Sequence, residues 1–297
     1  MQIDINTKMI TLIGKPLSQS FSARMQNKAY EAAGLNMLFF YTELEKNQLG
    51  AVVNGLRYMN IAGFSITKPY KVDVLKYLDQ LDPLCEKMGA ANTVLKTKDG
   101  KLIGYNTDGI GFYTGFLEET NIAVDQCVFF CFGGGGAGRA ICSILAYKGA
   151  KRIYVTDIFE ESARALVNDI NHNFAQVAEF VAYGDFSKIA ACDVVLNASG
   201  IGMGHSLGET PLPKKYVKPS QIYFDACYNP TKTQFLLNAE EKGCKIVNGL
   251  SMLLYQGVAQ LELWAGVKPP VKVMRQELLD ILAEVSTQES DKKRQLA

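Results

Sequence analysis

The sequence is poor in several features that mark common classes of protein. Its 297 residues include one tryptophan and two histidines, and the formal net charge is only +1. No apolar run approaches the roughly 18 residues that a membrane-spanning helix needs. Such balanced charge leaves no electrostatic footprint for nucleic acid. With only His172 and His205, a histidine-based metal site or a Ser-His triad is hard to build. We therefore expect no metal site, no nucleic-acid partner and no membrane span.

The cysteine pattern favours a reducing compartment. The count is odd and no two cysteines form a CxxC pair. Most lie in apolar segments, where a free cysteine behaves as a small hydrophobic residue. The first six residues also lack the basic-then-apolar pattern of a secretory signal. We therefore expect a cytoplasmic location. The seven cysteines are Cys85, Cys127, Cys131, Cys142, Cys192, Cys227 and Cys244.

Strand-like and helix-like segments alternate along the chain. The predicted strands comprise residues 9–13, 37–41, 61–66, 127–132, 152–155, 179–181, 194–197, 222–226 and 245–247, with a hairpin of residues 93–95 and 102–105 that turns at Asp99-Gly100. The predicted helices comprise residues 23–33, 48–58, 71–81, 111–119, 137–148, 160–173, 233–242 and 251–263. Residues 286–297 are polar and are expected to fray.

Helices of 10–15 residues between strands imply right-handed βαβ units and parallel sheets, so we predict an α/β fold. We expect a first α/β domain at residues 1–107 and a second, Rossmann-like domain inserted at residues 108–249. The C-terminal helices within residues 250–297 are expected to pack back on the first domain.

A glycine run follows the predicted strand at residues 127–132 and precedes a helix. The run comprises Gly133, Gly134, Gly135 and Gly136, followed by Ala137. Glycines let a backbone turn tightly and approach a pyrophosphate, whose charge the amides and the helix dipole then face. Taken alone, the run could also be a plain glycine-rich turn.

The next strand raises the odds of a dinucleotide site. It ends in Thr156-Asp157, and Asp157 can hydrogen-bond the ribose hydroxyls of a dinucleotide. A carboxylate there would repel a 2′-phosphate, and the following residues are Ile158 and Phe159 instead of an arginine. We therefore expect NAD in preference to NADP, with a helix N-cap as the alternative role of Asp157.

Polar segments interrupt the first domain where its strands should end. They are residues 14–22, 65–71 and 89–93, and residues 105–109 follow soon after. Because ligands of α/β sheets bind beyond the carboxyl ends of the strands, these segments could converge on one pocket. Their hydroxyls, one amide, Lys71 and Asp108 would suit a small polyhydroxylated acid. Taken alone, Lys71 could be a solvated helix residue and Asp108 a helix N-cap.

Together these motifs resemble the shikimate dehydrogenase family, and most closely its shikimate/quinate dehydrogenase branch, over about residues 9–266. The matching segments are Gly14-x-Pro16 with Ser20-x-Ser22, Thr67-x-Pro69-x-Lys71, Gly89 to Thr93, Asn106 to Gly109, the glycine run, Asn197-Ala198-Ser199, Asp225-x-x-Tyr228-x-Pro230 and Gly249-x-x-Met252-Leu253-x-x-Gln256. The resemblance implies an oxidoreductase of aromatic amino acid biosynthesis, with a substrate-binding first domain and a dinucleotide-binding second domain.

The resemblance also implies roles for particular residues. Lys71 and Asp108 would be the catalytic pair. Substrate contacts would come from Ser20, Ser22, Ser65, Thr67, Asn92, Tyr228 and Gln256. Cofactor contacts would come from Gly133, Gly134, Gly135, Gly136, Ala137, Asp157, Ile158, Phe159, Glu160, Asn197, Ser199, Ala226, Cys227, Tyr228, Asn229 and Gly249. Met252, Gln256 and Gln260 are spaced four apart, which places them on one helix face. A homodimer is the expected assembly.

Four positions depart from the family's usual pattern. Gln19 replaces a histidine, Ala23 a proline and Ser65 an asparagine, and Ile158 stands where NADP-dependent members carry a basic residue. The choice between shikimate and quinate therefore stays open. So do two alternatives: a dehydrogenase of the same plan that acts on another cyclic polyhydroxy or amino-hydroxy acid, and a non-catalytic NAD-binding homologue.

Overall fold

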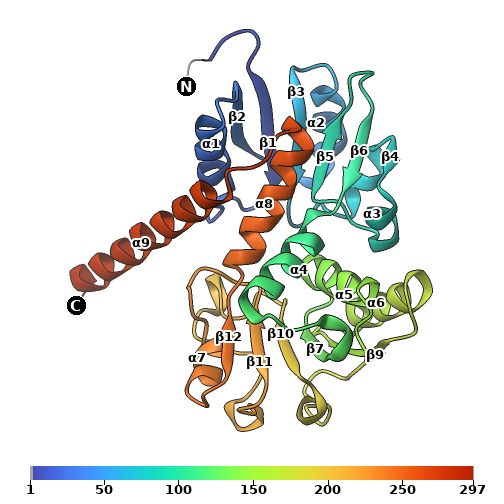
Figure 1. Cartoon of the computed structure of the whole chain (residues 1–297), viewed down its shortest axis with the longest axis vertical. Coiled ribbons are helices and arrows are strands. Elements are labelled where there is room, and N and C mark those ends of the chain that lie inside the picture. The colour runs from blue at the N-terminus through green and yellow to red at the C-terminus, as the bar shows by residue number, and fades with distance from the viewer. Residues whose placement is uncertain (1–2, 297) are drawn as a thin grey trace. The chain divides into compact units, whose positions relative to one another are not determined.

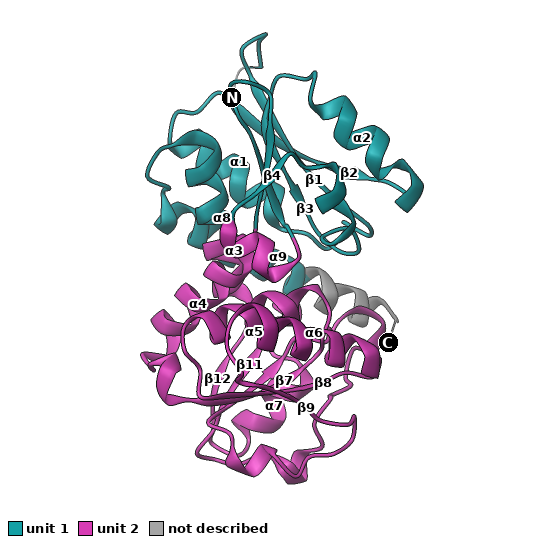
Figure 2. Cartoon of the chain, turned by 90° about the vertical axis from the view of Figure 1, so that its right-hand side faces the viewer, with its two compact units in different colours: residues 1–82, 91–105, 257–297 teal, residues 83–90, 106–256 magenta. Residues whose placement is uncertain are grey.

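The structure is a computed structural model that describes the backbone of residues 3–296 and the side chains of residues 3–287. The chain divides into two compact units, each built on one six-stranded sheet (Figures 1 and 2). Unit 1 comprises residues 1–82, 91–105 and 257–297, and unit 2 comprises residues 83–90 and 106–256. The predicted α/β fold class is confirmed. The predicted domain limits stay a prediction, because a compact unit need not coincide with an independently folding domain.

The sheet of unit 1 is mixed, in the order β2-β1-β3-β5-β6-β4. Strand β1 pairs in parallel with β2 and β3, whereas β5 pairs antiparallel with β3 and with β6. The hairpin of β5 and β6 forms as predicted, and Gly100 in its turn has a φ of 85°. The strands are β1 (Lys8–Gly14), β2 (Met37–Glu43), β3 (Ile61–Ile66), β4 (Gln80–Leu81), β5 (Thr93–Lys96) and β6 (Leu102–Tyr105).

The predicted helix at residues 71–81 is wrong. Asp73–Tyr77 forms only a short 3-10 helix, and Gln80–Leu81 then joins the sheet as β4 beside β6. The Asp79 carboxylate accepts the Leu102 N–H at 2.7 Å, and the Asp79 N–H donates to the Leu102 carbonyl at 2.9 Å. These bonds to the sheet edge replace the helical bonds that the apolar spacing predicted. The longer helices of unit 1 are α1 (Ser22–Ala32) and α2 (Leu49–Leu56).

The sheet of unit 2 is wholly parallel, in the order β12-β11-β10-β7-β8-β9. The chain winds outward from β7 through β8 to β9, returns to β10 on the other side of β7, and then continues to β12. The order therefore reverses between β7 and β10, which is the place where open α/β sheets bind ligands. The strands are β7 (Val128–Phe132), β8 (Arg152–Thr156), β9 (Ala178–Phe180), β10 (Val194–Asn197), β11 (Ile222–Asp225) and β12 (Lys245–Val247).

Both faces of this second sheet are covered, which explains its nearly continuous apolar strands. Side chains alternate between faces along a strand, so Phe129 and Cys131 enter one core cluster and Phe130 and Phe132 enter the other. Figure 2 shows α4, α5 and α6 over one face and α7 over the other. The helices are α3 (Pro83–Met88), α4 (Thr107–Thr120), α5 (Gly136–Tyr147), α6 (Glu160–Asn173) and α7 (Gln234–Glu240).

Two helices follow β12. Helix α8 (Leu250–Ala265) carries the chain from unit 2 into unit 1, and α9 (Val271–Leu296) begins directly after Pro270. The sequence predicts C-terminal helices within residues 250–297 and gives bounds only for the first, at residues 251–263. It also predicts fraying over residues 286–297, whereas α9 continues to Leu296. Ala297 lies outside the described residues. Arg24 of α1 hydrogen-bonds Glu277 and Glu284 of α9.

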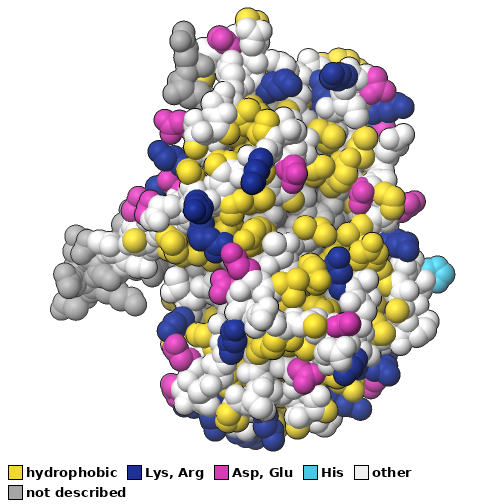
Figure 3. Space-filling model, in the orientation of Figure 1, with side chains coloured by type: hydrophobic (Ala, Val, Ile, Leu, Met, Phe, Trp, Pro, Cys, Tyr) yellow, Lys and Arg dark blue, Asp and Glu magenta, His cyan; other side chains and the backbone are white. Residues whose placement is uncertain are grey.

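None of the helices in the described part of the chain is long and apolar enough to cross a bilayer. On the face shown in Figure 3, acidic and basic side chains are interspersed among the described residues. That face therefore carries no extended patch of one sign, as the net charge of +1 would suggest.

Candidate active site

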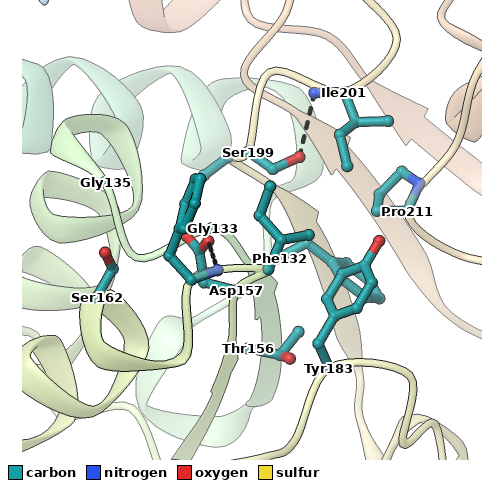
Figure 4. A pocket seen from close by; sticks show the side chains of 13 residues that line it. Phe132, Gly133, Gly135, Thr156, Asp157, Ser162, Tyr183, Ser199, Ile201 and Pro211 are labelled. Carbon is teal, nitrogen blue, oxygen red and sulfur yellow. Dashed lines mark hydrogen bonds between the residues drawn. The ribbon is translucent and has the colours of Figure 1, made fainter. Parts of the chain in front are cut away.

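A pocket of about 250 Å³ lies in unit 2 at the reversal point of the sheet (Figure 4). Residues at the ends of β7, β8 and β10 form its floor, and the loops that follow these strands form its walls. The lining residues are Phe132, Gly133, Gly135, Thr156, Asp157, Ile158, Phe159, Ser162, Tyr183, Ala198, Ser199, Ile201 and Pro211. A cofactor site at the carboxyl ends of parallel strands is typical of this type of sheet.

The glycine run packs so closely that side chains are excluded from parts of it. Gly133 has a φ of 111°, and a Cβ there would lie 2.7 Å from the backbone of Ala198 and Ser199. A Cβ on Gly138 would lie 1.8 Å from the Gly133 carbonyl oxygen. A Cβ on Gly135, in contrast, would meet no atom within 4 Å. Gly133 and Gly138 therefore allow the turn from β7 into α5, whereas Gly135 leaves open space beside the pocket.

This geometry fits a dinucleotide. Helix α5 begins at Gly136. Its N-cap residue is Gly135, which has no side chain that could accept a hydrogen bond from the first amides of the helix. The first amides of a helix lack partners within the helix, and they carry the positive end of its dipole. The space beside Gly135 and these amides together form a cradle for a pyrophosphate.

The Asp157 carboxylate supports the loops around the pocket. One oxygen accepts the Gly134 N–H at 2.6 Å, and the other accepts the Phe159 N–H at 2.8 Å. The side chain thus ties the glycine run after β7 to the loop after β8. It is not the N-cap of α6, because Phe159 occupies that position.

A buried polar network organises the neighbouring strand ends. Asp225 is fully buried and accepts hydrogen bonds from Thr233 Oγ1 at 2.6 Å, Asn197 Nδ2 at 3.0 Å and the Cys227 N–H at 2.9 Å. Burial raises the pKa of Asp225, and these hydrogen bonds oppose that rise. The Asn197 carbonyl oxygen accepts the Ser199 hydroxyl at 2.7 Å. The network therefore fixes the loops that follow β10 and β11.

The pocket includes only some of the predicted cofactor residues. Gly133, Gly135, Asp157, Ile158, Phe159 and Ser199 line it. The other predicted residues lie elsewhere in unit 2: Gly134, Gly136, Ala137 and Glu160 in the adjoining turns, Asn197 within the buried network, and Ala226, Cys227, Tyr228, Asn229 and Gly249 after β11 and β12. A Cβ on Gly249 would lie 2.1 Å from the Ala226 carbonyl oxygen, so these last two segments pack tightly.

Sequence reasoning missed several lining residues. Phe132 and Thr156 could have been found, because each is the last residue of a strand that precedes a predicted contact. Ser162 could also have been found, because it lies in the first turn of α6, two residues after the predicted contact Glu160. Ile201 lies two residues after the matching segment Asn197-Ala198-Ser199, whereas Tyr183 and Pro211 come from connections in which no local signal marks them.

Unit 1 places three of the predicted polar residues at or beside the ends of β3 and β5. The Thr67 N–H donates to the Ile13 carbonyl at 2.8 Å, which joins the end of β3 to β1. The Lys71 carbonyl accepts the Ala91 N–H at 2.9 Å, so the loops that carry Lys71 and Asn92 are hydrogen-bonded. Lys71 lies before the 3-10 helix at Asp73–Tyr77, so the alternative role as a helix residue does not hold.

The serines of unit 1 have structural partners. The Ser65 hydroxyl is buried and donates to the Asn92 carbonyl at 3.0 Å. Ser20 is half-buried, and its carbonyl accepts the Tyr41 hydroxyl at 2.6 Å. Ser22 is buried at the first position of α1. Ser65 therefore serves first as part of the strand packing.

The remaining predicted residues belong to unit 2. Asp108 is buried in the first turn of α4, whose N-cap is Asn106, so the N-cap alternative for Asp108 does not hold. Gln256 is buried in α8 and donates to the Leu253 carbonyl at 2.9 Å. Tyr228 is half-buried in the loop after β11. Among the residues that the structure describes, no three His, Cys, Asp or Glu side chains are grouped to hold a metal ion.

Two segments of the chain match known protein families. Residues 12–94 match the shikimate dehydrogenase substrate binding domain, and residues 249–279 match the shikimate 5′-dehydrogenase C-terminal domain. A shikimate dehydrogenase (NADP⁺) from Methanococcus aeolicus is 36% identical over 281 residues, which cover 94% of this chain and 100% of the relative.

Solved structures agree over nearly the whole chain. A shikimate dehydrogenase in complex with NADP⁺ has a TM-score of 0.89 and 33% identity, and covers 95% of this chain and 98% of its own. Shikimate 5-dehydrogenase from Listeria monocytogenes, in complex with shikimate and NAD, has a TM-score of 0.87 and 36% identity, with 94% and 98% covered.

The predicted preference for NAD is wrong. Similar curated proteins from Methanococcus maripaludis, Moorella thermoacetica and Methanocaldococcus jannaschii, like that from M. aeolicus, are all named shikimate dehydrogenase (NADP⁺). The prediction rested on Asp157 as a ribose ligand. Its two carboxylate oxygens instead accept backbone N–H groups of the loops, so an acidic residue at this position does not by itself decide the cofactor.

Proposed function

Since this chain belongs to the shikimate dehydrogenase family, we propose that it interconverts shikimate and 3-dehydroshikimate with NADP(H). The observation that carries the proposal is the full-length match to a relative named for this activity, combined with the pocket at the reversal point of the unit 2 sheet. The reaction moves a hydride from a ring carbon and a proton from the hydroxyl on that carbon. The dinucleotide, when bound, supplies or accepts the hydride.

The residues of unit 2 would hold the dinucleotide mainly through the backbone. The first amides of α5 would bind the pyrophosphate, and the open space beside Gly135 would accommodate it. At the ribose end, the Ser162 hydroxyl is a donor suited to a phosphate. The described lining includes no lysine or arginine, and Arg164, two residues further along α6, pairs with Glu160. The 2′-phosphate would therefore depend on hydroxyl and backbone donors more than on a guanidinium.

Lys71 and Asp108 would manage the proton, as the family resemblance implies. In the oxidative direction the Lys71 Nζ accepts the proton of the reacting hydroxyl, and in the reductive direction it returns that proton to the oxygen. Asp108 sits in the first turn of α4, where the positive end of the helix dipole stabilises a carboxylate. The family resemblance implies that it would act with Lys71 on the reacting hydroxyl.

Hydroxyl and amide side chains would bind the substrate. Ser20, Ser22 and Thr67 would donate to its carboxylate, and Asn92, Tyr228 and Gln256 would contact its ring hydroxyls. Quinate shares the carboxylate and the vicinal hydroxyls, so it is the second candidate substrate.

Initial-rate kinetics test the proposal. Shikimate and quinate are each assayed with NADP⁺ while absorbance of the reduced cofactor is followed. Shikimate-dependent reduction of NADP⁺ is the expected result. No reduction with either acid, despite measurable NADP⁺ binding, would contradict the proposed activity and favour a non-catalytic homologue.

The setting of the enzyme is part of the proposal. All seven cysteines are buried thiols, as is usual for proteins of a reducing compartment. We place the protein in the cytoplasm as a homodimer. Sedimentation at several protein concentrations would check the oligomeric state.

A further inference from the structure

Unit 1 contains a buried hydrogen-bond network that joins α8 to β3 and β5. At its centre is Gln260, whose side chain is 1% exposed. The Gln260 Nε2 donates to the Ser65 hydroxyl at 2.9 Å and to the Thr93 hydroxyl at 3.0 Å. Both hydroxyl residues are themselves buried. One amide nitrogen thus connects two neighbouring strands of the sheet.

The chemistry of the groups gives this network a direction. An amide nitrogen can only donate, so both hydroxyls must accept from Gln260 and have one proton each to give. Ser65 gives its proton to the Asn92 main-chain carbonyl at 3.0 Å, and Thr93 gives its proton to the Asn92 side-chain carbonyl at 2.9 Å. Both branches of the network therefore end on Asn92.

This direction fixes which way the Asn92 amide faces. Its Oδ1 is held against the Thr93 hydroxyl, so its Nδ2 is turned to the opposite side. A flipped amide would bring Nδ2 to a hydroxyl whose proton also has to find an acceptor. The main chain of Asn92 is held as well, because its carbonyl accepts the Ile66 N–H at 2.8 Å and its N–H donates to Tyr105 at 3.1 Å.

We propose that Gln260 is a positioning residue of the enzyme, which acts through Ser65 and Thr93 to present the Asn92 side-chain amide to a substrate hydroxyl in a single orientation. This inference rests on the proposed function, because it takes Asn92 as a substrate contact. Ser65 then serves as a link in the network instead of a direct ligand.

The same helix offers a matched control. Trp264 lies one turn beyond Gln260, is also buried, and donates from its indole nitrogen to the Val94 carbonyl at 3.0 Å. It fastens α8 to β5, as Gln260 does, but makes no hydrogen bond to Ser65, Thr93 or Asn92 in the described structure. Trp264→Phe therefore removes one buried helix-to-strand bond and leaves the Asn92 network intact.

The experiment compares Gln260→Leu with Trp264→Phe. Both variants should unfold at lower temperature than the wild type. Only Gln260→Leu should raise the KM for shikimate, by about 10-fold, with the KM for NADP⁺ unchanged, since the lost orientation is worth about one hydrogen bond.

Thr93 provides a second and independent variant. Thr93→Val should raise the KM for shikimate by a similar factor, and Thr93→Ser, which keeps the hydroxyl, should restore it. Combining Thr93→Val with Gln260→Leu should add little, because both break the same chain of hydrogen bonds.

The two hypotheses fail in different ways. An active wild type whose shikimate KM is unchanged in both Gln260→Leu and Thr93→Val would overturn the positioning role and leave the proposed function intact. A wild type that does not oxidise shikimate would overturn the proposed function.

Discussion

The two units differ in what each offers for binding a small molecule. In unit 2 the pocket combines glycines of the run after β7 with side chains that follow β7, β8 and β10, and the Asp157 and Asp225 carboxylates hold the neighbouring loops through backbone N–H groups. In unit 1 the predicted substrate residue Asn92 instead belongs to a buried network of side-chain hydrogen bonds with Ser65 and Thr93. We therefore expect backbone changes in the glycine run of unit 2 to alter binding of the proposed dinucleotide, and side-chain changes in unit 1 to alter binding of the proposed substrate.

Lys71, the proposed proton-transfer residue, belongs to unit 1, so we expect the largest effect there. Lys71→Ala should lower kcat by about 1,000-fold, because general acid–base catalysis is lost. The dissociation constant for NADP⁺ should stay unchanged, since the proposed dinucleotide site lies in unit 2. Fluorescence titration and steady-state rates measure the two quantities, and Lys68→Ala, an exposed lysine of the same loop, is the control. Equal losses of turnover and of cofactor binding would contradict the assigned role.

Two glycines with opposite surroundings test the proposed dinucleotide site of unit 2. Gly138→Ala places a Cβ 1.8 Å from the Gly133 carbonyl oxygen. It should lower the unfolding temperature and raise the KM for NADP⁺ by about 10- to 100-fold, the equivalent of roughly 1–3 kcal/mol of overpacking.

Gly135→Ala is the partner variant, because its Cβ meets no protein atom within 4 Å. It should unfold at the wild-type temperature. It should nevertheless bind NADP⁺ more weakly, because the new methyl group occupies space proposed for the pyrophosphate. If both variants unfold alike, the close packing of the run is not what requires glycine.

In the loop after β11, side chains stabilise the strand ends of unit 2. Thr233→Val removes a 2.6 Å donor to the buried Asp225 and the N-cap of α7. We expect a loss of about 2 kcal/mol in the free energy of unfolding near neutral pH, and Thr233→Ser should retain most of it.

The loss should depend on pH in a defined sense. Burial raises the native pKa of Asp225, so the stability linked to its protonation is complete below the unfolded pKa of about 3.9 and is lost as pH rises through the native pKa. Without the Thr233 hydroxyl the native pKa rises further. Urea titrations should therefore show a larger difference between Thr233→Val and wild type at neutral pH than at about pH 4. A constant difference would mean that Asp225 does not ionise in the native protein.

The smallest effect concerns the 2′-phosphate. Ser162→Arg would add a cation to a described lining that has none, and should lower the KM for NADP⁺ roughly threefold at low salt without changing the KM for NAD⁺. Ser162→Met, of comparable length but uncharged, is the control. A similar gain from both variants would show that size and not charge is responsible.

The same contrast explains what the sequence could predict. The glycine run and the strands beside it were recognisable because a positive φ at Gly133 and an apolar strand such as β7 are local requirements. The network around Gln260 was not, because its partners are 195 and 167 residues away in the chain.

Tertiary pairing also explains the main error in secondary structure. The apolar residues of the segment 71–81 have the spacing of a helix, but Gln80–Leu81 pairs with β6 at the edge of the unit 1 sheet instead. The cofactor prediction failed for a related reason: Asp157 is acidic in the expected place, and only the structure shows that its oxygens serve the loops.

Isotope transfer tests the central claim most directly. 3-Dehydroshikimate is incubated with the wild-type protein and NADPH deuterated at nicotinamide C4, with each face labelled in separate reactions, and the product is analysed by mass spectrometry. The account predicts shikimate that carries a single deuterium on the ring carbon from one of the two labelled cofactors. The absence of shikimate, or shikimate without deuterium from either cofactor, would contradict direct hydride transfer by this enzyme.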